Sequence, residues 1–408
     1  MSQQRRKSTA GGEWDPVGGR RSTLRQGYWR SEELYIDGDQ WFDGMLADLA
    51  AARWRIDFEV YIFDDDAMGE RMCAALRAAA ERGVQVRLMV DGAGSGQWLW
   101  QRAPELLGSP LALRVYHPLP GQMLSWAFLG RSRLVALVHQ VLRINRRNHR
   151  KVTIIDRRIA WVGSFNVSTN VLRSVSGDNA WYDAGARVEG PAIIELERAF
   201  THAWEKAWRF NRNRLQAPAL RPRRPVELES GLVRLNHRLR LRRHRYEELI
   251  RRITGAKRRI WIAMAYFVPG RRLVRALGDA VARGVDVRLM MSERSDVPFM
   301  PWVALCFQIA LLGRGVRIFN YLPRFLHAKI LLIDDWLCVG STNLNARSLL
   351  HDLEADVVLL QPKSQRRMQE IFQADFAQCA ELHHHDCVAR PWHRRCLAWC
   401  ILKFRYYL

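Results

Sequence analysis

The stretch His149–Asp156, which is His-Arg-Lys-Val-Thr-Ile-Ile-Asp, sets the architecture of this chain because its chemistry occurs twice. It is followed by Gly163–Asn166, which is Gly-Ser-Phe-Asn. The second copy runs from His327-Ala328-Lys329 through Asp334 to Gly340-Ser341-Thr342-Asn343. Side chains alternate between the two faces of a strand, so a His and the Lys two residues later share one face. Each copy therefore predicts a β-hairpin with an imidazole and an ammonium group on the same side.

The segments before the two motifs repeat as well, each as a β-α-β unit. Gly83 and Gly284 are expected to cap the helices, and they are 201 residues apart, whereas His149 and His327 are 178 apart. The first half therefore holds about 23 additional residues. A helix over Trp41–Ala52 is expected to precede the first unit. The first unit is expected to have strand Ile56–Phe63, helix Met68–Glu81 and strand Val84–Val90. The second is expected to have strand Ile260–Phe267, helix Leu273–Ala282 and strand Val285–Met291.

Length and composition indicate a globular protein with an anionic partner. The chain has 408 residues, of which 48% are hydrophobic, enough for two or three domains. Its 64 Lys and Arg against 41 Asp and Glu give a net charge of +23, which suits nucleic acid or an anionic membrane surface. The 16 Trp fit either a lipid headgroup boundary or stacked bases. We favour the membrane, because Trp-Arg pairs lie in apolar helical stretches.

Two basic segments are candidate membrane-surface elements. The additional length falls within Trp98–Asn148, where apolar residues interleave with arginines from 122 to 144. A helix packed over the mouth of the site is the alternative. The tail after Arg390 is basic and rich in aromatic residues, and five cations could tether it at roughly 1 kcal/mol each. A dimer or domain contact is the alternative there. After the first motif we expect a strand over Ala186–Val188 and a long helix over Pro191–Trp208.

Other targeting and metal signals are weak. The start of the chain has Arg5, Arg6 and Lys7 but no apolar segment typical of a secretory signal. The longest apolar run, Phe299–Leu312, is interrupted by Gln308 and is shorter than the roughly 20 residues that span a bilayer, so no transmembrane helix is predicted. Seven cysteines indicate a reduced compartment and not a disulfide framework. A zinc site at Cys396 and Cys400, with His383–His385, Cys387 and His393, matches no recurring spacing.

Brought together, the two motifs suit phosphodiester chemistry. One imidazole attacks phosphorus to give a phosphohistidine, while the other protonates the leaving oxygen, and the roles reverse in the second step. Lys151 and Lys329 would stabilise charge on the nonbridging oxygens, with Asn166, Asn343, Ser164 and Ser341 as further phosphate ligands. No carboxylate cluster suited to magnesium and no glycine-rich phosphate loop is present in the sequence. We therefore expect neither a metal nor a cofactor.

The paired pattern resembles the doubled HxK(x)4D signature of the phospholipase D superfamily over residues 33 to 380. Within it, Arg146–Lys151, Tyr61–Phe63, Tyr266–Pro269 and Asn343-Leu344 with Arg347-Ser348 are most similar to bacterial cardiolipin synthases, of the type without amino-terminal transmembrane helices. The resemblance implies a monomer with two α/β halves related by a pseudo-twofold axis. Each half would have a mostly parallel central sheet flanked by helices, and the halves would share one active site.

The resemblance also implies roles for individual residues. His149 is implied as the nucleophile and His327 as the acid and base. Asp183 and Glu354, one acid downstream of each motif, would orient the imidazoles. Asp156 and Asp334 complete the catalytic motifs, although their position at hairpin turns favours a structural role.

Two departures from the pattern affect the second motif. Six residues separate Asp156 from Gly163, but only five separate Asp334 from Gly340, so Asp335 competes with Asp334 for the motif position. We assign it to Asp334. Asn345 stands where the family usually has Asp after the second Gly-Ser-x-Asn, and this bears on acceptor binding.

The leading functional hypothesis is a cardiolipin synthase, which transfers a phosphatidyl group to phosphatidylglycerol. Phosphatidylethanolamine is a second possible donor. The alternatives are hydrolysis by a phospholipase D, a nuclease of the same superfamily, and an inactive scaffold at the membrane surface. A nuclease needs neither basic apolar segment, so no nucleic-acid partner is expected, and we place the protein in the cytoplasm, bound peripherally to the inner membrane. The expected segments are a disordered basic start 1–30, a first half 31–214, a linker 215–225, a second half 226–382 and a tail 383–408.

Overall fold

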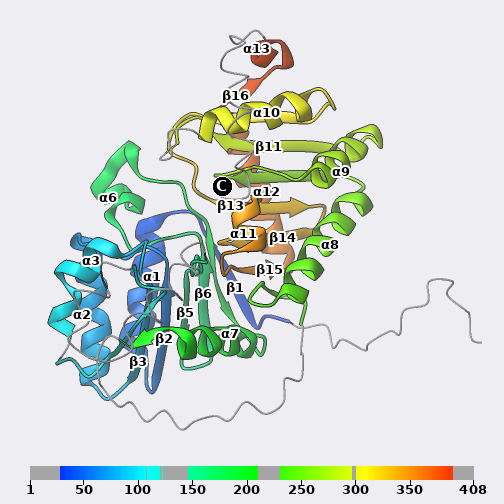
Figure 1. The fold of residues 1–408 in the computed structure, drawn as a ribbon. Helices are drawn as coiled ribbons and strands as arrows, with labels where there is room; N and C mark the ends of the chain where they lie inside the picture. Colours follow the sequence, from blue (N-terminus) through cyan, green and yellow to red (C-terminus); the bar gives the residue numbers. More distant parts are fainter. Residues whose placement is uncertain are drawn as a thin grey trace, which may run out of the picture.

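Two eight-stranded sheets, one from each half of the chain, form the framework of the protein (Figure 1). The computed structural model describes residues 28–106, 108–119, 122, 146–209, 230–295 and 300–388, without the side chains of 300–302 and 388. The basic segment 122–144 apart from Gln122, the linker 215–225, the start of the chain to residue 27 and the tail from residue 389 lie outside the described residues. The expectations for those segments, and for the domain limits, remain predictions.

The first sheet is mixed. Its β2–β3 and β3–β4 pairs are parallel, and its other neighbours are antiparallel. The expectation of a mostly parallel sheet is therefore wrong, because the motif hairpin inserts antiparallel strands beside the β-α-β unit. The strands in spatial order are β1 (Ser31–Tyr35), β7 (Gly185–Glu189), β6 (Ile159–Gly163), β5 (Val152–Ile155), β2 (Arg55–Val60), β3 (Gln85–Asp91), β4 (Ala112–Tyr116) and β8 (Trp208–Arg209).

The second sheet has the same order of equivalent strands when its strands, given below from β16 to β9, are taken in the opposite direction. Its β10–β11 and β11–β12 pairs are parallel, and the others are antiparallel. The repeat confirms the predicted α/β duplication. The strands are β16 (Cys379–Leu382), β12 (Arg317–Tyr321), β11 (Asp286–Ser292), β10 (Arg259–Met264), β13 (Lys329–Ile333), β14 (Trp336–Gly340), β15 (Ala355–Leu359) and β9 (Val233–Leu235).

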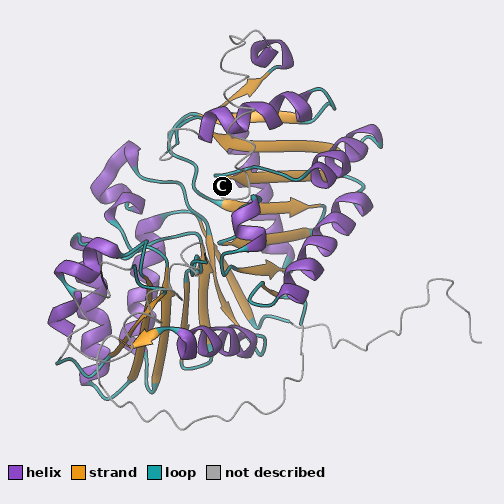
Figure 2. Cartoon of the chain, viewed as in Figure 1, coloured by secondary structure: helices purple, strands orange, loops and turns teal. Residues whose placement is uncertain are grey.

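Helices cover both faces of each sheet (Figure 2). Asp37 and Asp66 cap the first two helices through their carboxylates. Gly83 and Gly284 have φ of 92° and 84°, as their predicted C-cap positions require. The helices are α1 (Gly38–Ala51), α2 (Ala67–Glu81), α3 (Gly96–Gln101), α6 (Arg173–Ser176), α7 (Ile193–Lys206), α8 (Leu239–Gly255), α9 (Arg271–Ala282), α10 (Met300–Leu312), α11 (Ala346–Leu350), α12 (Pro362–Phe376) and α13 (His384–Val388), with 3₁₀ turns at Ala103–Leu106, Thr169–Val171 and Gly177–Asn179.

Strand alternation separates three apolar cores. In β2, Ile56 and Phe58 face a core beneath α1 and α2, and in β10, Ile260 and Ile262 face the equivalent core beneath α8 and α9. Residues on the opposite face of β10, such as Trp261, join a third core that includes α7 of the first half and α12 of the second. The shared core holds the two sheets together, so the motif hairpins of both halves face a common interior.

The described residues contain no helix that is both long and apolar enough to cross a membrane. From Met300 to Leu312 the apolar run forms α10, which packs on β12 and α9. Gln308, which interrupts the run, is buried and lies 3.9 Å from the sulfur of Met291.

Candidate active site

Backbone hydrogen bonds between the halves place the two histidines at the shared interior. The N–H of His149 donates to the carbonyl of Leu353 at 3.0 Å, and the N–H of Leu353 donates to the carbonyl of Arg147 at 2.8 Å. The pseudo-symmetric bonds join His327 to the carbonyl of Tyr182 at 2.8 Å and Tyr182 to the carbonyl of Phe325 at 2.9 Å. Each histidine is thus fixed against the loop of the other half that carries an acid.

Each imidazole is paired with the acid of the opposite half. Nδ1 of His149 lies 3.1 Å from both carboxylate oxygens of Glu354, and Nδ1 of His327 lies 2.6 Å from Asp183. The resemblance implied both acids, but not that each one serves the histidine of the other half. A carboxylate at Nδ1 fixes the ring orientation and leaves Nε2 for the substrate, which is the arrangement required of a nucleophile or a proton carrier.

The pKa of each imidazole reflects burial. Burial lowers the pKa of both His149 and His327, and the two lysines lower it further, although the carboxylates act in the opposite direction. Burial alone would raise the pKa of Asp183 and Glu354, but their histidine partners and lysines lower it. The free site therefore holds two neutral imidazoles, each beside an ionised carboxylate.

Lys151 and Lys329 bring two buried cations to the histidines. The ammonium of Lys151 donates to the carbonyl of His149 at 2.8 Å, and that of Lys329 donates to the carbonyl of His327. Burial lowers the pKa of Lys151 to about 7, and repulsion from Lys329 adds to the shift. Two cations held close together favour the entry of an anion, whose charge would favour the ammonium form of Lys151.

Aromatic rings border both histidines. The ring of Tyr61 stands 5.0 Å from that of His149 in an edge orientation, and the ammonium of Lys151 lies 5.2 Å from the Tyr61 ring centre. On the other side, Trp181 and Phe325 lie 5.0 and 6.0 Å from His327. These rings restrict the imidazoles to one orientation and limit water around them.

The two asparagines and two serines of the motifs have different surroundings. Asn166 accepts a hydrogen bond from the N–H of Ile62 through Oδ1, and Oδ1 of buried Asn343 has no hydrogen-bond partner among the described residues. Both remain candidates for phosphate. Ser341 donates to Glu354, and Ser164 exchanges hydrogen bonds with the backbone of Ala184 and contacts Asp183, so their phosphate role stays a prediction. The serine hydroxyls therefore hold the orienting acids.

The motif aspartates lie at the far ends of the strands from the histidines. Asp156 accepts backbone N–H bonds from Arg53, Trp54 and Arg55, between 2.8 and 3.0 Å. Asp334 accepts the equivalent bonds from Lys257, Arg258 and Arg259. Both have positive φ, 50° and 49°. These carboxylates hold the start of β2 and β10 to the hairpins, which supports the structural role, and their place among the catalytic residues stays a prediction. Asp334, not Asp335, is the counterpart of Asp156.

Arg150, between the motif His and Lys, has a role that the sequence analysis missed. It is fully buried, and Nη1 donates to the carbonyl of Ala199 at 3.2 Å and lies 3.7 Å from the carboxylate of Glu59. Nε donates to the carbonyl of Glu354 at 3.4 Å. Alternation along the strand was the available signal, because it turns Arg150 away from His149 and Lys151. Arg150 connects the first half to the acid that orients His149.

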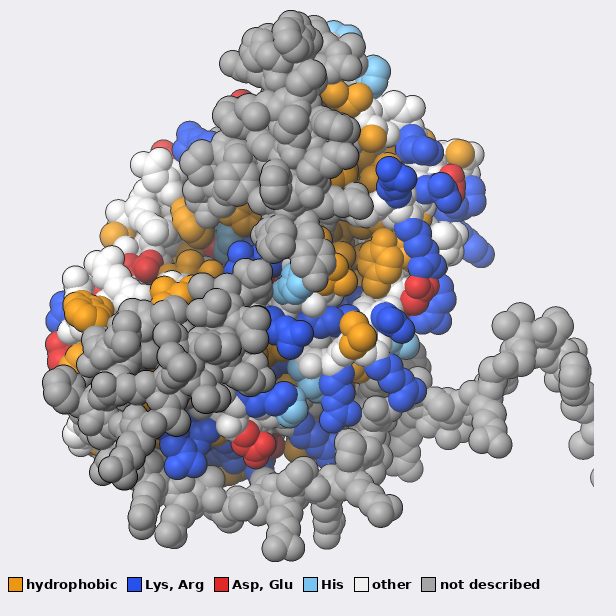
Figure 3. Space-filling model, viewed as in Figure 1, with side chains coloured by type: hydrophobic (Ala, Val, Ile, Leu, Met, Phe, Trp, Pro, Cys, Tyr) orange, Lys and Arg blue, Asp and Glu red, His pale blue; other side chains and the backbone are white. Residues whose placement is uncertain are grey.

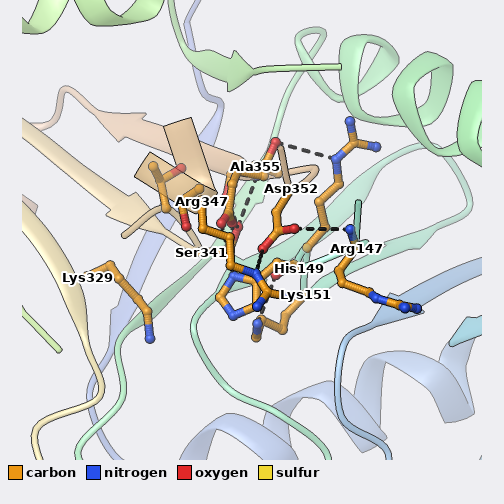
Figure 4. A network of polar contacts seen from close by, with 12 residues as sticks. Arg147, His149, Lys151, Lys329, Ser341, Arg347, Asp352 and Ala355 are labelled. Atoms are coloured by element: carbon orange, nitrogen blue, oxygen red, sulfur yellow. Dashed lines mark hydrogen bonds and ion pairs between the residues drawn. The ribbon is translucent and has the colours of Figure 1, made fainter. Parts of the chain in front are cut away.

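A second missed group lies beside His149 (Figure 4). Asp352 accepts from the N–H of Arg147 at 3.0 Å and from Nε of Arg347 at 2.9 Å. Arg347 belongs to the short helix α11, which Asn345 caps by accepting the N–H of Ser348 at 2.9 Å. Asparagine caps a helix as well as aspartate does, so the departure at Asn345 preserves this local structure.

Metal-binding groups and one small cavity bear on what else the described residues could hold. Among the described residues, no group of three or more His, Cys, Asp or Glu is placed to hold a metal ion. A cavity of about 40 Å³ beneath α8 is lined by Arg234, Arg242, Arg245 and Lys329, but by neither histidine. Its volume suits a water molecule or two and not a lipid headgroup.

Comparison with known proteins identifies this arrangement. The family described as cardiolipin synthase with a phospholipase D-like domain matches residues 45–204 and 249–376, which include both motifs. The chain belongs to this family. Cardiolipin synthase B of Escherichia coli K12 is 33% identical over 336 residues, which cover 80% of this chain and 76% of that protein. A cardiolipin synthase of Clostridium perfringens is 29% identical over 86% of this chain and 71% of its own length.

Solved structures share the fold of this cardiolipin synthase family member. The phosphatidylserine synthase of Haemophilus influenzae has a TM-score of 0.63 and 12% identity, covering 92% of this chain and 94% of that one. Polyphosphate kinase of Porphyromonas gingivalis has a TM-score of 0.53 and 14% identity, covering 86% of this chain and 50% of its own. The duplicated fold and the phospholipase D-like assignment thus agree with the prediction, and the chain is a phosphatidyltransferase of that superfamily.

Proposed function

We propose that the protein synthesises cardiolipin by transferring a phosphatidyl group through a phosphohistidine to the free hydroxyl of phosphatidylglycerol. The observation that carries this proposal is the exchanged pairing of His149 with Glu354 and of His327 with Asp183, at the junction of the two halves. It provides two imidazoles, each paired with a carboxylate, of which one can act as the nucleophile and the other as the general acid and base. Phosphatidylglycerol and phosphatidylethanolamine are the candidate donors.

His149 is the proposed nucleophile. Its side chain is 13% exposed, against 6% for His327, so it is the more accessible to phosphorus. Nε2 of His149 attacks phosphorus, the bond from phosphorus to the headgroup oxygen breaks, and His327 donates the proton that this oxygen needs. The arriving phosphodiester adds a negative charge beside the ring, which raises the pKa of His327 and favours the protonated ring that this step needs.

In the second step the acceptor hydroxyl replaces the leaving alcohol. His327 removes its proton, the new oxygen–phosphorus bond forms, and the bond from phosphorus to His149 breaks. Lys151 and Lys329, with Asn166 and Asn343, stabilise the nonbridging oxygens in both steps. The acids Glu354 and Asp183 stabilise the imidazolium that forms on each ring.

The experiment separates the two histidines. A donor whose leaving group needs no proton, such as a p-nitrophenyl phosphatidyl ester labelled with ³²P, is mixed with His149→Ala and His327→Ala. We expect His327→Ala to accumulate an acid-labile phosphoprotein and His149→Ala to form none. Labelled phosphoprotein in His149→Ala, or normal turnover of phosphatidylglycerol in either variant, would refute the proposal. Chromatography of the wild-type products distinguishes cardiolipin from the phosphatidic acid that hydrolysis gives.

We also propose peripheral binding to an anionic membrane. The net charge of +23 supports it, and the basic segments 122–144 and 390–408 are the proposed contacts. Deletion of 390–408 should move the protein from sedimented phosphatidylglycerol vesicles to the supernatant. Equal sedimentation of the deleted and full chains would refute the tail as an anchor.

A further inference from the structure

Three arginines surround one loop at the edge of the site. Arg146 precedes the first motif, Arg242 lies on α8, and Arg347 lies on α11. All three lie close enough to His351 to lower its pKa, which burial lowers most and Asp352 raises. The loop also contains Asp352, which holds Arg147 and so connects the arginines to the segment of His149. Three cations from both halves thus meet beside the proposed nucleophile.

The guanidinium of Arg347 is held through Nε, while its terminal nitrogens are available to a ligand. Its Nε donates to Asp352 at 2.9 Å, while its side chain stays 39% exposed. The terminal nitrogens Nη1 and Nη2 have no hydrogen-bond partner among the described residues. Figure 4 shows Arg347 extending from its helix to the same network as His149. An anchored guanidinium with two available donor groups suits a phosphate that arrives from outside.

The other two arginines differ in how they are held. Arg242 donates through Nη2 to the carbonyls of His351 and Asp352, at 3.0 and 3.1 Å, and its Nη1 is buried without a partner among the described residues. Arg146 is exposed, and its carbonyl accepts from Nδ1 of His117. Figure 3 shows many Lys and Arg side chains, with several His side chains among them, on the face that it displays. Lys151 and Lys329 already neutralise the reacting phosphate. The positive charge of the three arginines is therefore available to a second anion.

The negative charge that these arginines could bind is the phosphodiester of the acceptor lipid. In the proposed reaction the acceptor carries its own phosphodiester, separated from the attacking hydroxyl oxygen by three carbons and one oxygen, roughly 6 Å from oxygen to phosphorus at ordinary bond lengths. The leaving glycerol and the competing water are uncharged. A cationic subsite beside the nucleophile therefore favours the lipid acceptor over water.

We propose that Arg146, Arg242 and Arg347 form a second phosphate subsite, which holds the phosphodiester of the acceptor while its hydroxyl attacks the phosphohistidine. This inference rests on the proposed function and deepens it, because it names the charge of the acceptor as the property that is selected. In the attack, the oxygen–phosphorus bond forms, the bond to His149 breaks, and the hydroxyl proton passes to His327. The arginines take no part in these bond changes.

The test compares two soluble acceptors with the full-length protein and labelled phosphatidylglycerol in mixed micelles. Glycerophosphoglycerol carries the phosphodiester, and glycerol carries the same hydroxyl without it. Loss of an arginine–phosphate bond should lower kcat/KM for the charged acceptor, relative to that for glycerol, about tenfold in Arg347→Gln, mainly through KM. Arg347→Lys should restore part of this ratio, and Arg146→Gln should lower it in the same direction.

The matched control is Arg251→Gln, which removes an exposed arginine from α8, the helix of Arg242, and should leave the ratio unchanged. An equal fall for both acceptors in Arg347→Gln, or no fall for either, would overturn the subsite. If the wild-type protein transfers label to neither acceptor nor to phosphatidylglycerol, the proposed function itself has failed.

Discussion

The carboxylate of Glu354 lies 3.1 Å from Nδ1 of His149, although 205 residues separate the two along the chain and each belongs to a different half. The equivalent bond joins His327 to Asp183. Neither half therefore contains a complete histidine–carboxylate pair. Removing one acid should disable the histidine of the opposite half, which makes the exchange open to experiment.

Glu354→Gln should slow the attack by His149. Loss of the carboxylate removes the group that fixes the ring and stabilises its imidazolium, an effect of about 10²–10⁴ in rate for related triads. Formation of the phosphoprotein from an activated donor should be slow in Glu354→Gln and nearly normal in Asp183→Asn, where only proton transfer by His327 suffers. Rapid-quench measurement of the labelled protein provides both rates. The reverse order of the two variants would contradict the exchanged roles.

Arg150→Met should lower both stability and kcat. It leaves the buried carboxylate of Glu59 without its cation, a change that costs about 3 kcal/mol of unfolding free energy when one partner of a buried pair is removed. The kcat should fall because the carbonyl of Glu354 loses its donor. Urea unfolding measures the first effect, and Arg150→Met with Glu59→Gln should recover part of the stability. A wild-type free energy of unfolding in Arg150→Met would show that the Arg150–Glu59 pair does not stabilise the protein.

Asp156→Ala should destabilise the protein while its chemistry continues. The variant loses three hydrogen bonds from backbone N–H groups and places alanine at a positive φ, together costing about 2–3 kcal/mol. Asp335→Ala is the control, since this exposed residue contributes only an ion pair with Arg258, worth about 0.5 kcal/mol or less. Thermal unfolding and kcat are measured together. A loss of kcat as large as that of His149→Ala would show that Asp156 acts in catalysis.

The pH dependence of kcat/KM should report Lys151. Its pKa is lowered to about 7, so the ammonium is present below about pH 7 and is lost as pH rises through that value. The pKa of His149 is lowered from 6.5, so the neutral nucleophile persists to below that pH. We expect the fall of kcat/KM with rising pH, which loss of the His327 proton begins at lower pH, to steepen above about pH 7, and Lys151→Arg to move this steeper limb to higher pH. An identical alkaline limb in Lys151→Arg would assign it to another group.

Local patterns predicted the elements well, because they depend on neighbours in sequence. The predicted helix Met68–Glu81 forms as Ala67–Glu81, and the predicted strand Val285–Met291 forms as Asp286–Ser292. The predicted long helix Pro191–Trp208 is shorter, at Ile193–Lys206. The strand direction was wrong for most of each sheet, since hairpin strands and crossover strands have the same alternation and differ only in their partners.

The sequence by itself determined the duplication and the shared face of each motif's histidine and lysine, because residue identity and spacing within one strand fix which side chains share a face. The two acids were implied by the resemblance to the family. Only the tertiary structure decided which acid serves which histidine, that Ser164 and Ser341 hold acids, that Arg150 joins the halves, and that Arg347 opens beside His149. These relationships cross between segments up to 205 residues apart. Spacing along the chain carries no information about such contacts, since they arise when the two sheets bury their shared apolar core.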